Sequence, residues 1–413
     1  MPDFLPFRGL RFGSSGLDQV GAPPYDVIDP VERIALAERD PFNVIRLILP
    51  VAEPGDADEY ARARADLDAW TNDGVLAVDP EPTFTVYRMS YLDHEGTARR
   101  TIGVLGALGL PDAHGEGDIL PHERTIPKHR DDRLRLLRAT RANLDPIWGL
   151  SLATGLREVL LPIAVREPDA TATEHLADGT EVTHEAWVVT DDGPIDDIRK
   201  LVSSAPVVLA DGHHRFQTAC TFRDEVAGDA AAAHGADAIL TLIVELDEVD
   251  LYVQPIERVV RGIDGPAVRT SLEEVATLTP LSTPAPDARG PVWIDRDGAF
   301  LLTATDESRR ALEADEPQPI ASTDAAWFEH AVAPLLGADA DVTYRHDPAR
   351  VARLVESGEA DAVVLLRPVT VEQIRTAAIE RLRFPQKSTF FAPKPLTGVV
   401  MRRLDDQPQS ETN

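Results

Sequence analysis

The sequence predicts a mixed α+β protein with a main domain followed by a smaller α/β subdomain. Apolar runs typical of strands, such as residues 84–89 and 238–246, alternate with segments of helical periodicity, such as residues 57–71. The chain has 413 residues, enough for two domains of ordinary size. A stretch rich in Pro, Asp, Gly and Ala over residues 264–320 marks a linker or peripheral subdomain.

The individual elements follow from local patterns. Two prolines at 23 and 24 impose an extended loop, and helical spacing begins a few residues later. The helices expected from apolar periodicity lie near 30–39, 57–71, 133–143, 195–203, 217–234 and 371–383. The expected strands are 7–12, 84–89, 99–110, 186–191, 207–211, 238–246, 251–253 and 360–367, with a hairpin turn at 93–96.

These elements divide the chain into expected domains. We expect a main α+β domain over residues 1–263, which carries the Pro-Pro-Tyr-Asp, His-Glu-Arg-Thr and Asp-Gly-His-His-Arg motifs. A C-terminal α/β subdomain is expected over residues 264–404. The polar residues 405–413 are expected to form a disordered tail.

Composition limits the classes of partner. The formal net charge is −29, which disfavours binding to the phosphate backbone of nucleic acids. No run approaches the roughly 20 apolar residues of a membrane-spanning helix, and no secretory signal is visible at the start. The single cysteine, Cys220, cannot form an internal disulfide and is expected to pack in a helix. We therefore expect a cytoplasmic protein that binds small molecules.

The most informative motif lies where an apolar run ends and a helical pattern begins. Its five residues are Asp211, Gly212, His213, His214 and Arg215. Glycine lets the backbone turn tightly, the first amides of a helix favour an anion, and a guanidinium binds phosphate or carboxylate. The carboxylate is a candidate base or metal ligand. The alternative is a polar turn whose histidines satisfy local hydrogen bonds.

A second polar cluster precedes the expected helix at 133–143. It contains His122, Glu123, Arg124 and Thr125, followed by Lys128 and Arg133. Imidazole and carboxylate groups suit acid–base chemistry or metal ligation, and an arginine in the first helical turn is favoured only near an anion. A solvated charged loop is the alternative.

A third cluster, Lys387, Ser388 and Thr389, combines an ammonium with two hydroxyl groups between aromatic residues. These groups suit a phosphate, although no glycine-rich loop precedes them as in a Walker motif. A fourth candidate is the rigid loop that presents Tyr25 and Asp26, which either positions a substrate or caps the next helix. No spacing typical of a zinc site is present, whereas magnesium held by carboxylates and phosphates remains open.

These motifs, in this order, resemble a family of prokaryotic proteins described as domain-of-unknown-function family 1015. The resemblance covers nearly the whole chain and includes Pro393-Lys394 after the third cluster. The chain departs from the family at residues 255–258, where Pro-Ile-Glu-Arg replaces a Pro-Thr-His-Arg-like stretch.

The Asp-Gly-His-His-Arg motif is also similar to that of the ParB/sulfiredoxin-like superfamily, including its free-serine kinases. This resemblance implies a ParB/sulfiredoxin-like nucleotide-binding core and ATP or ADP with Mg²⁺ as cofactors. It also implies phosphate contacts from Gly212, His213, His214 and Arg215, and a catalytic role for Asp211.

Together the motifs predict a nucleotide-dependent phosphotransferase acting on a small hydroxylated metabolite, with free L-serine the best single candidate. In this hypothesis Asp211 or Glu123 accepts the hydroxyl proton. Lys387, Ser388 and Thr389 join the phosphate site, while Tyr25, Asp26, His122 and Arg133 bind the substrate. The alternatives are a phosphoester hydrolase and a non-enzymatic, ParB-like nucleotide-binding regulator.

Overall fold

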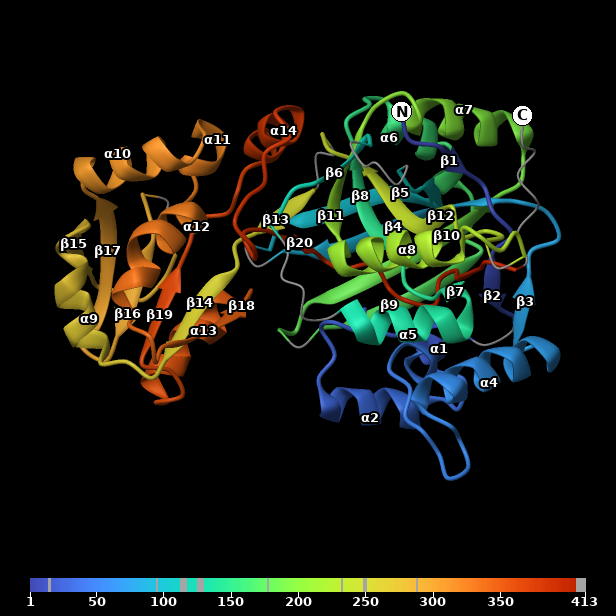
Figure 1. Ribbon diagram of the computed structural model, residues 1–413, viewed down its shortest axis with the longest axis horizontal. Helices are drawn as coiled ribbons and strands as arrows, with labels where there is room; N and C mark the ends of the chain where they lie inside the picture. The colour runs from blue at the N-terminus through green and yellow to red at the C-terminus, as the bar shows by residue number, and fades with distance from the viewer. Residues whose placement is uncertain are drawn as a thin grey trace. The chain divides into compact units, whose positions relative to one another are not determined.

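The chain folds into two compact units, described here from a computed structural model (Figure 1). Unit 1 comprises Met1–Leu120, Thr125–Leu251 and Pro393–Asn413, and unit 2 comprises Pro121–Arg124 and Tyr252–Ala392. The structure describes residues 1–13, 16–93, 96–111, 117–124, 130–176, 178–231, 233–247, 251–286 and 289–405.

Unit 1 is organised around a nine-stranded sheet with the order β6-β11-β8-β12-β5-β4-β10-β9, in which β1 also pairs with β5. Strands β8 and β12 run parallel, whereas β11 is antiparallel to β8. The strands are β1 (Phe4–Leu5), β4 (Phe84–Leu92), β5 (Ala98–Gly109), β6 (Ile119–Pro121), β8 (Ile147–Ser151), β9 (Ala170–His175), β10 (Glu181–Val189), β11 (Val207–Asp211) and β12 (Ala238–Glu245). Two small ladders, β2 (Leu10–Phe12) with β3 (Leu76–Val78) and β7 (Ala142–Asn143) with β21 (Arg402–Arg403), complete unit 1.

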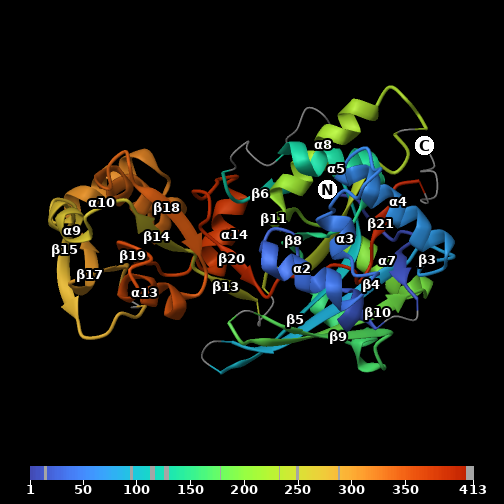
Figure 2. The ribbon, with the colours of Figure 1, turned by 90° about the horizontal axis from the view of Figure 1, so that it is seen from below.

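Helices cover this sheet and bury two main apolar clusters. One cluster joins the sheet to α6, α7 and α8, and the other joins α2, α3, α4 and α5 to the N-terminal strands. The views in Figures 1 and 2 agree that α5 and α8 lie side by side. The helices of unit 1 are α1 (Leu17–Val20), α2 (Pro30–Arg39), α3 (Ile45–Ile48), α4 (Glu59–Asn72), α5 (Arg130–Thr140), α6 (Leu156–Leu160), α7 (Asp192–Val202) and α8 (His213–Val226), with a 3₁₀ turn at Ile163–Val165.

Unit 2 is built on an antiparallel six-stranded sheet with the order β15-β17-β16-β19-β14-β18. Its strands are β14 (Glu257–Arg261), β15 (Ala276–Leu281), β16 (Val292–Asp295), β17 (Gly298–Ala304), β18 (Asp341–Arg345) and β19 (Ala362–Leu365), and β13 (Tyr252–Gln254) pairs separately with β20 (Phe390–Ala392). Its helices are α9 (Gly265–Leu272), α10 (Asp306–Asp315), α11 (Gln318–Ala321), α12 (Asp324–Trp327), α13 (Pro348–Glu356) and α14 (Val371–Ile379), with a π-helical turn at Phe328–Val332 and a 3₁₀ turn at Ala333–Leu335.

The mixed α+β class is confirmed, as are most of the expected elements. The helix expected at 217–234 is wrong beyond Val226, because Gly228 and Asp229 lead into turns. The described residues of the stretch 264–320 belong to unit 2 and form α9, α10, the start of α11 and the strands β15, β16 and β17. The tip of the expected hairpin and most of the expected tail lie outside the described residues.

The compact units also differ in extent from the two expected segments. We expected the second domain to begin at residue 264, whereas the chain enters unit 2 at Tyr252, where β13 pairs with β20. After Ala392 the chain returns to unit 1, so the Pro393-Lys394 motif belongs to the larger sheet's unit.

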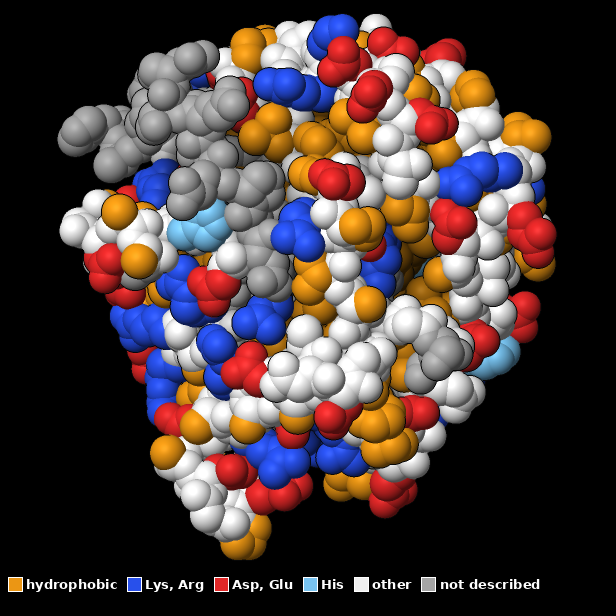
Figure 3. Space-filling model, turned by 90° about the vertical axis from the view of Figure 1, so that its right-hand side faces the viewer, with side chains coloured by type: hydrophobic (Ala, Val, Ile, Leu, Met, Phe, Trp, Pro, Cys, Tyr) orange, Lys and Arg blue, Asp and Glu red, His pale blue; other side chains and the backbone are white. Residues whose placement is uncertain are grey.

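Charge is distributed over the surface of unit 1 in both signs. On the face that Figure 3 shows, Asp and Glu side chains are interspersed with Lys and Arg side chains. No described helix combines the length and apolar character needed to span a membrane.

Candidate functional site

The Asp-Gly-His-His-Arg motif forms the predicted strand-to-helix junction. Asp211 ends β11 directly after a bulge, since the pairing register with β8 shifts between Leu209 and Asp211. Bulges of this kind redirect the side chain that follows them. Gly212 has φ +86°, and a Cβ there would lie 2.7 Å from the Cγ2 of Ile147, so only glycine fits without strain.

Arg215, in the first turn of α8, is held in a fixed orientation by two contacts. Its Nη2 donates to the Oδ2 of Asp211 at 2.9 Å, and its Nη1 donates to the carbonyl oxygen of Pro146 at 2.6 Å. Burial lowers the pKa of this guanidinium, but the charges of Asp211 and Asp145 outweigh burial and raise it. The arginine is therefore a permanent, pre-positioned cation at the N-terminus of α8.

Lys394 joins the same cluster from the C-terminal segment of the chain. Its Nζ donates to the Oδ2 of Asp26 at 2.7 Å and to the Oδ1 of Asp211 at 2.9 Å. The lysine side chain is 10% exposed. Burial acts to lower its pKa, but the two carboxylates raise it well above the ordinary value. Both oxygens of Asp211 thus accept hydrogen bonds from cationic side chains.

Tyr25 lies among the arginines of this cluster. The guanidinium carbons of Arg133 and Arg215 are 4.3 Å and 5.7 Å from the centre of its ring. Arg133 donates to Asp132 and to the carbonyl oxygen of Ile48, which fixes it against the ring. Burial raises the pKa of Tyr25, so the phenol is a neutral hydrogen-bonding group at physiological pH.

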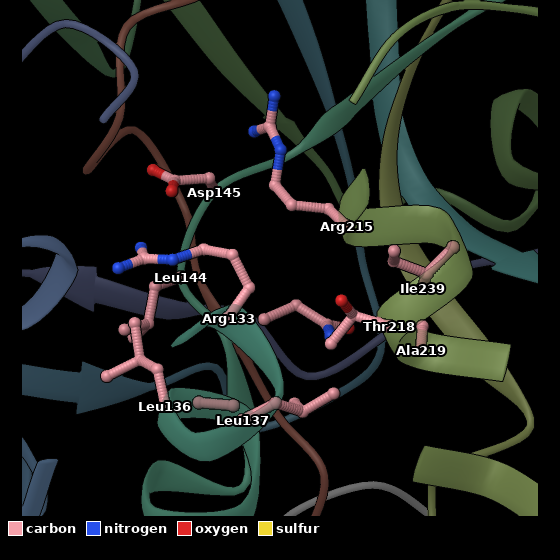
Figure 4. A pocket seen from close by; sticks show the side chains of 11 residues that line it. Arg133, Leu136, Leu137, Leu144, Asp145, Arg215, Thr218, Ala219 and Ile239 are labelled. Atoms are coloured by element: carbon pink, nitrogen blue, oxygen red, sulfur yellow. The ribbon is translucent and has the colours of Figure 1, made fainter. Parts of the chain in front are cut away.

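A small pocket of about 50 Å³ opens beside the cluster, between α5 and α8 (Figure 4). Arg133 and Arg215 line it together with Asp145, a buried carboxylate whose Oδ1 accepts a hydrogen bond from Thr397 at 2.6 Å. Burial raises the pKa of Asp145, although the nearby arginines oppose this effect.

In unit 2, Glu123 organises the Lys387-Ser388-Thr389 turn. Its carboxylate accepts from the backbone amides of these three residues at 2.9, 3.1 and 2.9 Å, and from the hydroxyl of Thr389 at 2.8 Å. Lys387 has φ +56°, a backbone conformation that residues other than glycine rarely adopt. The turn thus presents its amides to an anion, and that anion is a side chain of the same unit.

Other side chains around the Lys387-Ser388-Thr389 turn also form hydrogen bonds within unit 2. His122 is 1% exposed, and its Nε2 lies 2.7 Å from the Oγ1 of Thr389. The buried hydroxyl of Ser388 donates to the carbonyl oxygen of Pro385. Lys387 is exposed, which leaves its ammonium as the group most accessible to a ligand. Glu123 therefore holds the turn through these contacts, and its role in proton transfer stays a prediction.

The structure thus sorts the predicted site residues into two clusters. Tyr25, Asp26, Arg133 and residues 211–215 belong to unit 1, whereas His122, Glu123 and residues 387–389 belong to unit 2. Thr125 and Lys128 lie outside the described residues. His213 and His214 are half-buried in the first turn of α8.

Sequence reasoning named Lys394 within a motif but did not include it among the site residues, and it missed Asp145. Lys394 is one of four lysines in a chain rich in arginine. Asp145 carries no comparable signal, because a single aspartate before a proline and a strand is typical of a turn.

The described residues contain no group of three or more His, Cys, Asp or Glu side chains arranged to hold a metal ion. Asp26 and Asp211 do converge, but on the ammonium of Lys394. These two carboxylates therefore do not form a metal site by themselves.

The fold and this cluster define an α+β protein with a cationic strand-to-helix junction. Over residues 4–331 the sequence matches the family described as "Protein of unknown function (DUF1015)", and the chain belongs to this family. This confirms the first of the two resemblances. No curated protein matches the sequence.

Several solved structures are similar in part to this chain. A conserved hypothetical protein from Pyrococcus furiosus is 12% identical, with a TM-score of 0.37 over 70% of this chain and 93% of that one. A free serine kinase in complex with AMP is 11% identical, with a TM-score of 0.36 over 67% and 84% of the two chains. C-terminally truncated SbnI from Staphylococcus aureus is 10% identical, with a TM-score of 0.36 over 71% and 85%. At TM-scores below 0.5, these likenesses indicate neither the fold nor the activity of this chain.

Proposed function

We propose that this protein is a nucleotide-dependent phosphotransferase that acts on a small hydroxylated metabolite, with free L-serine as the first acceptor to test. The observation that carries the proposal is the placement of Lys394 and Arg215 on the two oxygens of Asp211, at the N-terminus of α8. Two buried cations, a helix N-terminus and a carboxylate at one point are what phosphoryl transfer requires.

The cations supply the electrostatic part of the reaction. Arg215 is fixed by the Pro146 carbonyl, so it can exchange its contact with Asp211 for a phosphate oxygen without moving its backbone. Lys394 is a compact point charge that Asp26 continues to hold when Asp211 is released. Both side chains then stabilise negative charge that develops on the transferred group.

Asp211 is the proposed base. In the structure, Lys394 and Arg215 contact both of its oxygens. When these cations turn toward phosphate oxygens, the carboxylate becomes available to accept the proton of an acceptor hydroxyl. This sequence couples phosphate binding to activation of the acceptor.

ATP or ADP is the proposed phosphate donor, with Mg²⁺ accompanying its phosphates. The ion would enter with the nucleotide rather than bind beforehand, since Asp26 and Asp211 already converge on Lys394. Within unit 2 itself, we propose the exposed ammonium of Lys387 as a phosphate contact of that unit. Ser388 and Thr389 support its turn through their internal hydrogen bonds.

The test is a comparison of wild type with Asp211→Asn in a phosphorus NMR assay of ATP or ADP with L-serine and other small hydroxy compounds. Loss of the base lowers the rate by about 10² to 10⁴. The matched control is Asp196→Asn, which changes an exposed aspartate paired with Lys200 and leaves the rate unchanged. Circular dichroism verifies that both variants fold.

The proposal fails if wild type transfers no phosphate from either nucleotide to any acceptor in the panel. It also fails if Asp211→Asn is as active as Asp196→Asn. Release of inorganic phosphate from phosphoesters without nucleotide contradicts it in favour of a hydrolase.

A further inference from the structure

The pocket between α5 and α8 has a lining that the proposed phosphate chemistry leaves unexplained. Figure 4 shows Arg215 and Thr218 entering it from α8, Arg133 from α5, and Asp145 from the loop before β8. Its volume of about 50 Å³ corresponds to roughly four water-sized groups. The pocket suits a small ligand or one end of a larger one, but not a whole nucleotide.

Thr218 differs from the other threonines of the described helices, whose hydroxyl groups all have a hydrogen-bond partner. A threonine hydroxyl in a helix commonly donates to the carbonyl four residues earlier. Thr71, Thr140, Thr221 and Thr270 all do so. Thr218 is 3% exposed and lines the pocket, yet its Oγ1 has no hydrogen-bond partner within the structure described. A buried hydroxyl of this kind is destabilising unless a group in the pocket binds it.

Arg215 presents a second donor of the same kind. Its two Nη atoms bind Asp211 and Pro146, whereas its buried Nε has no partner among the described residues. Asn143 adds a third donor. Its Oδ1 already accepts from the amide of Leu240 and from Arg402, so the group it can offer the pocket is its NH₂.

The rest of the wall is apolar. Leu136 and Leu137 of α5 face Ala219 of α8 and Ile239 of β12 across the pocket. A bare inorganic anion would leave this surface uncovered, whereas a short hydrocarbon stem would cover it.

We propose that this pocket binds the carboxylate end of a small organic acid of two or three carbons. The carboxylate oxygens accept from Thr218 Oγ1, Arg215 Nε and the Asn143 amide, and the carbon stem packs on the leucines of α5. A carboxylate with one or two carbons matches the available volume. That this acid is the hydroxyl-bearing acceptor rests on the proposed function, but its binding does not.

Asp145 determines which acids the pocket prefers. As a carboxylate it pairs with an α-ammonium group, and when protonated it donates to a carboxylate oxygen. Its raised pKa is compatible with the second state as well as the first. Glycine and alanine test the first state, and glycolate and lactate test the second.

The experiment is isothermal titration calorimetry of the full chain in the absence of nucleotide. The ligands are glycolate, lactate, glycine and alanine, and propane-1,2-diol is the control that lacks a carboxylate. The variants are Thr218→Val and, one turn along the same helix, Thr221→Val, whose hydroxyl is exposed and bonded to Gln217. At least one acid binds wild type, the diol does not, and Thr218→Val weakens binding about tenfold. Thr221→Val binds like wild type.

Thermal melting separates loss of contact from loss of fold. Thr218→Val melts no lower than wild type without ligand, because its hydroxyl has no bond to lose. The proposal is overturned if no acid binds, if the diol binds equally well, or if Thr218→Val binds like Thr221→Val. If an acid binds and Thr218→Val alone weakens its binding, but no phosphate is transferred, the proposed function is contradicted and the assignment of the pocket is still supported.

Discussion

Replacing Lys394 with methionine tests whether the charge cluster in unit 1 is as tightly coupled as its geometry implies. The substitution keeps the length of the side chain and removes the ammonium that contacts Asp26 and Asp211. Two carboxylates then face each other without the cation between them.

The size of the effect follows from exposure. Removing one partner of a fully buried ion pair costs roughly 3–5 kcal/mol. Here the side chain of Asp26 is 37% exposed, so water can replace the lost ammonium. Asp211 keeps its ion pair with Arg215. We therefore expect a loss of about 2 kcal/mol in the free energy of unfolding, which lowers the melting temperature by roughly 4–8 °C for a unit of this size.

The pH dependence adds a second check. The pKa of Lys394 is raised above its ordinary value of 10.5 in the folded state. Its contribution to stability is therefore complete below 10.5 and is lost only as the pH rises through the higher folded value. The difference between wild type and Lys394→Met stays constant from pH 6 to pH 10.

The measurement is urea unfolding monitored by circular dichroism, with Lys200→Met as the matched control. Lys200 forms an exposed ion pair with Asp196 at 3.4 Å, which contributes at most about 1 kcal/mol. If Lys394→Met is no less stable than Lys200→Met, the reasoning about a buried bridge is refuted.

Two further predictions concern unit 2. Glu123→Gln replaces a carboxylate oxygen with an NH₂ group that faces backbone amides. We therefore expect the free energy of unfolding to fall by about 1–3 kcal/mol, and the amides of Lys387, Ser388 and Thr389 to exchange hydrogen faster. Unchanged exchange would contradict the role of Glu123 in holding the turn. Burial raises the pKa of Glu257 from 4.5 to about 8. Between these two pH values the folded state holds a proton that the unfolded state releases. The free energy of unfolding is therefore highest below pH 4.5 and falls as the pH rises toward 8. The melting temperature of Glu257→Gln should therefore rise relative to that of wild type between pH 5 and pH 9. If the melting temperatures of the two proteins change in parallel with pH, the raised pKa of Glu257 is contradicted.

Local elements were predictable because their causes are local. The helix at Pro30–Arg39 begins at Asp29, whose side chain caps the first amides, with proline in the first turn. The β11–α8 junction follows from an apolar run, one glycine and the helical spacing after it. Where such signals were weak, as beyond Val226, the predicted helix was too long.

The association of the motifs was not predictable, because the sequence carries no distance between them. The loop with Tyr25 and Asp26 lies beside the Asp-Gly-His-His-Arg motif, and Lys394 joins both from the C-terminal segment. Glu123 instead meets the Lys387–Thr389 turn in the other unit. We had expected Glu123 and Asp211 to be alternative bases at one site.

The sequence by itself determined the α+β class, the family and an anion-attracting junction at Asp211–Arg215, because strand, glycine turn and helix are set by neighbouring residues. Only the tertiary structure decided which charges meet there. Asp211 is 183 residues from Lys394, and Asp26 is 368 residues from it. Ion pairs over such separations depend on how the sheet and its helices pack, and that packing converts a polar turn into a buried cationic cluster beside a pocket.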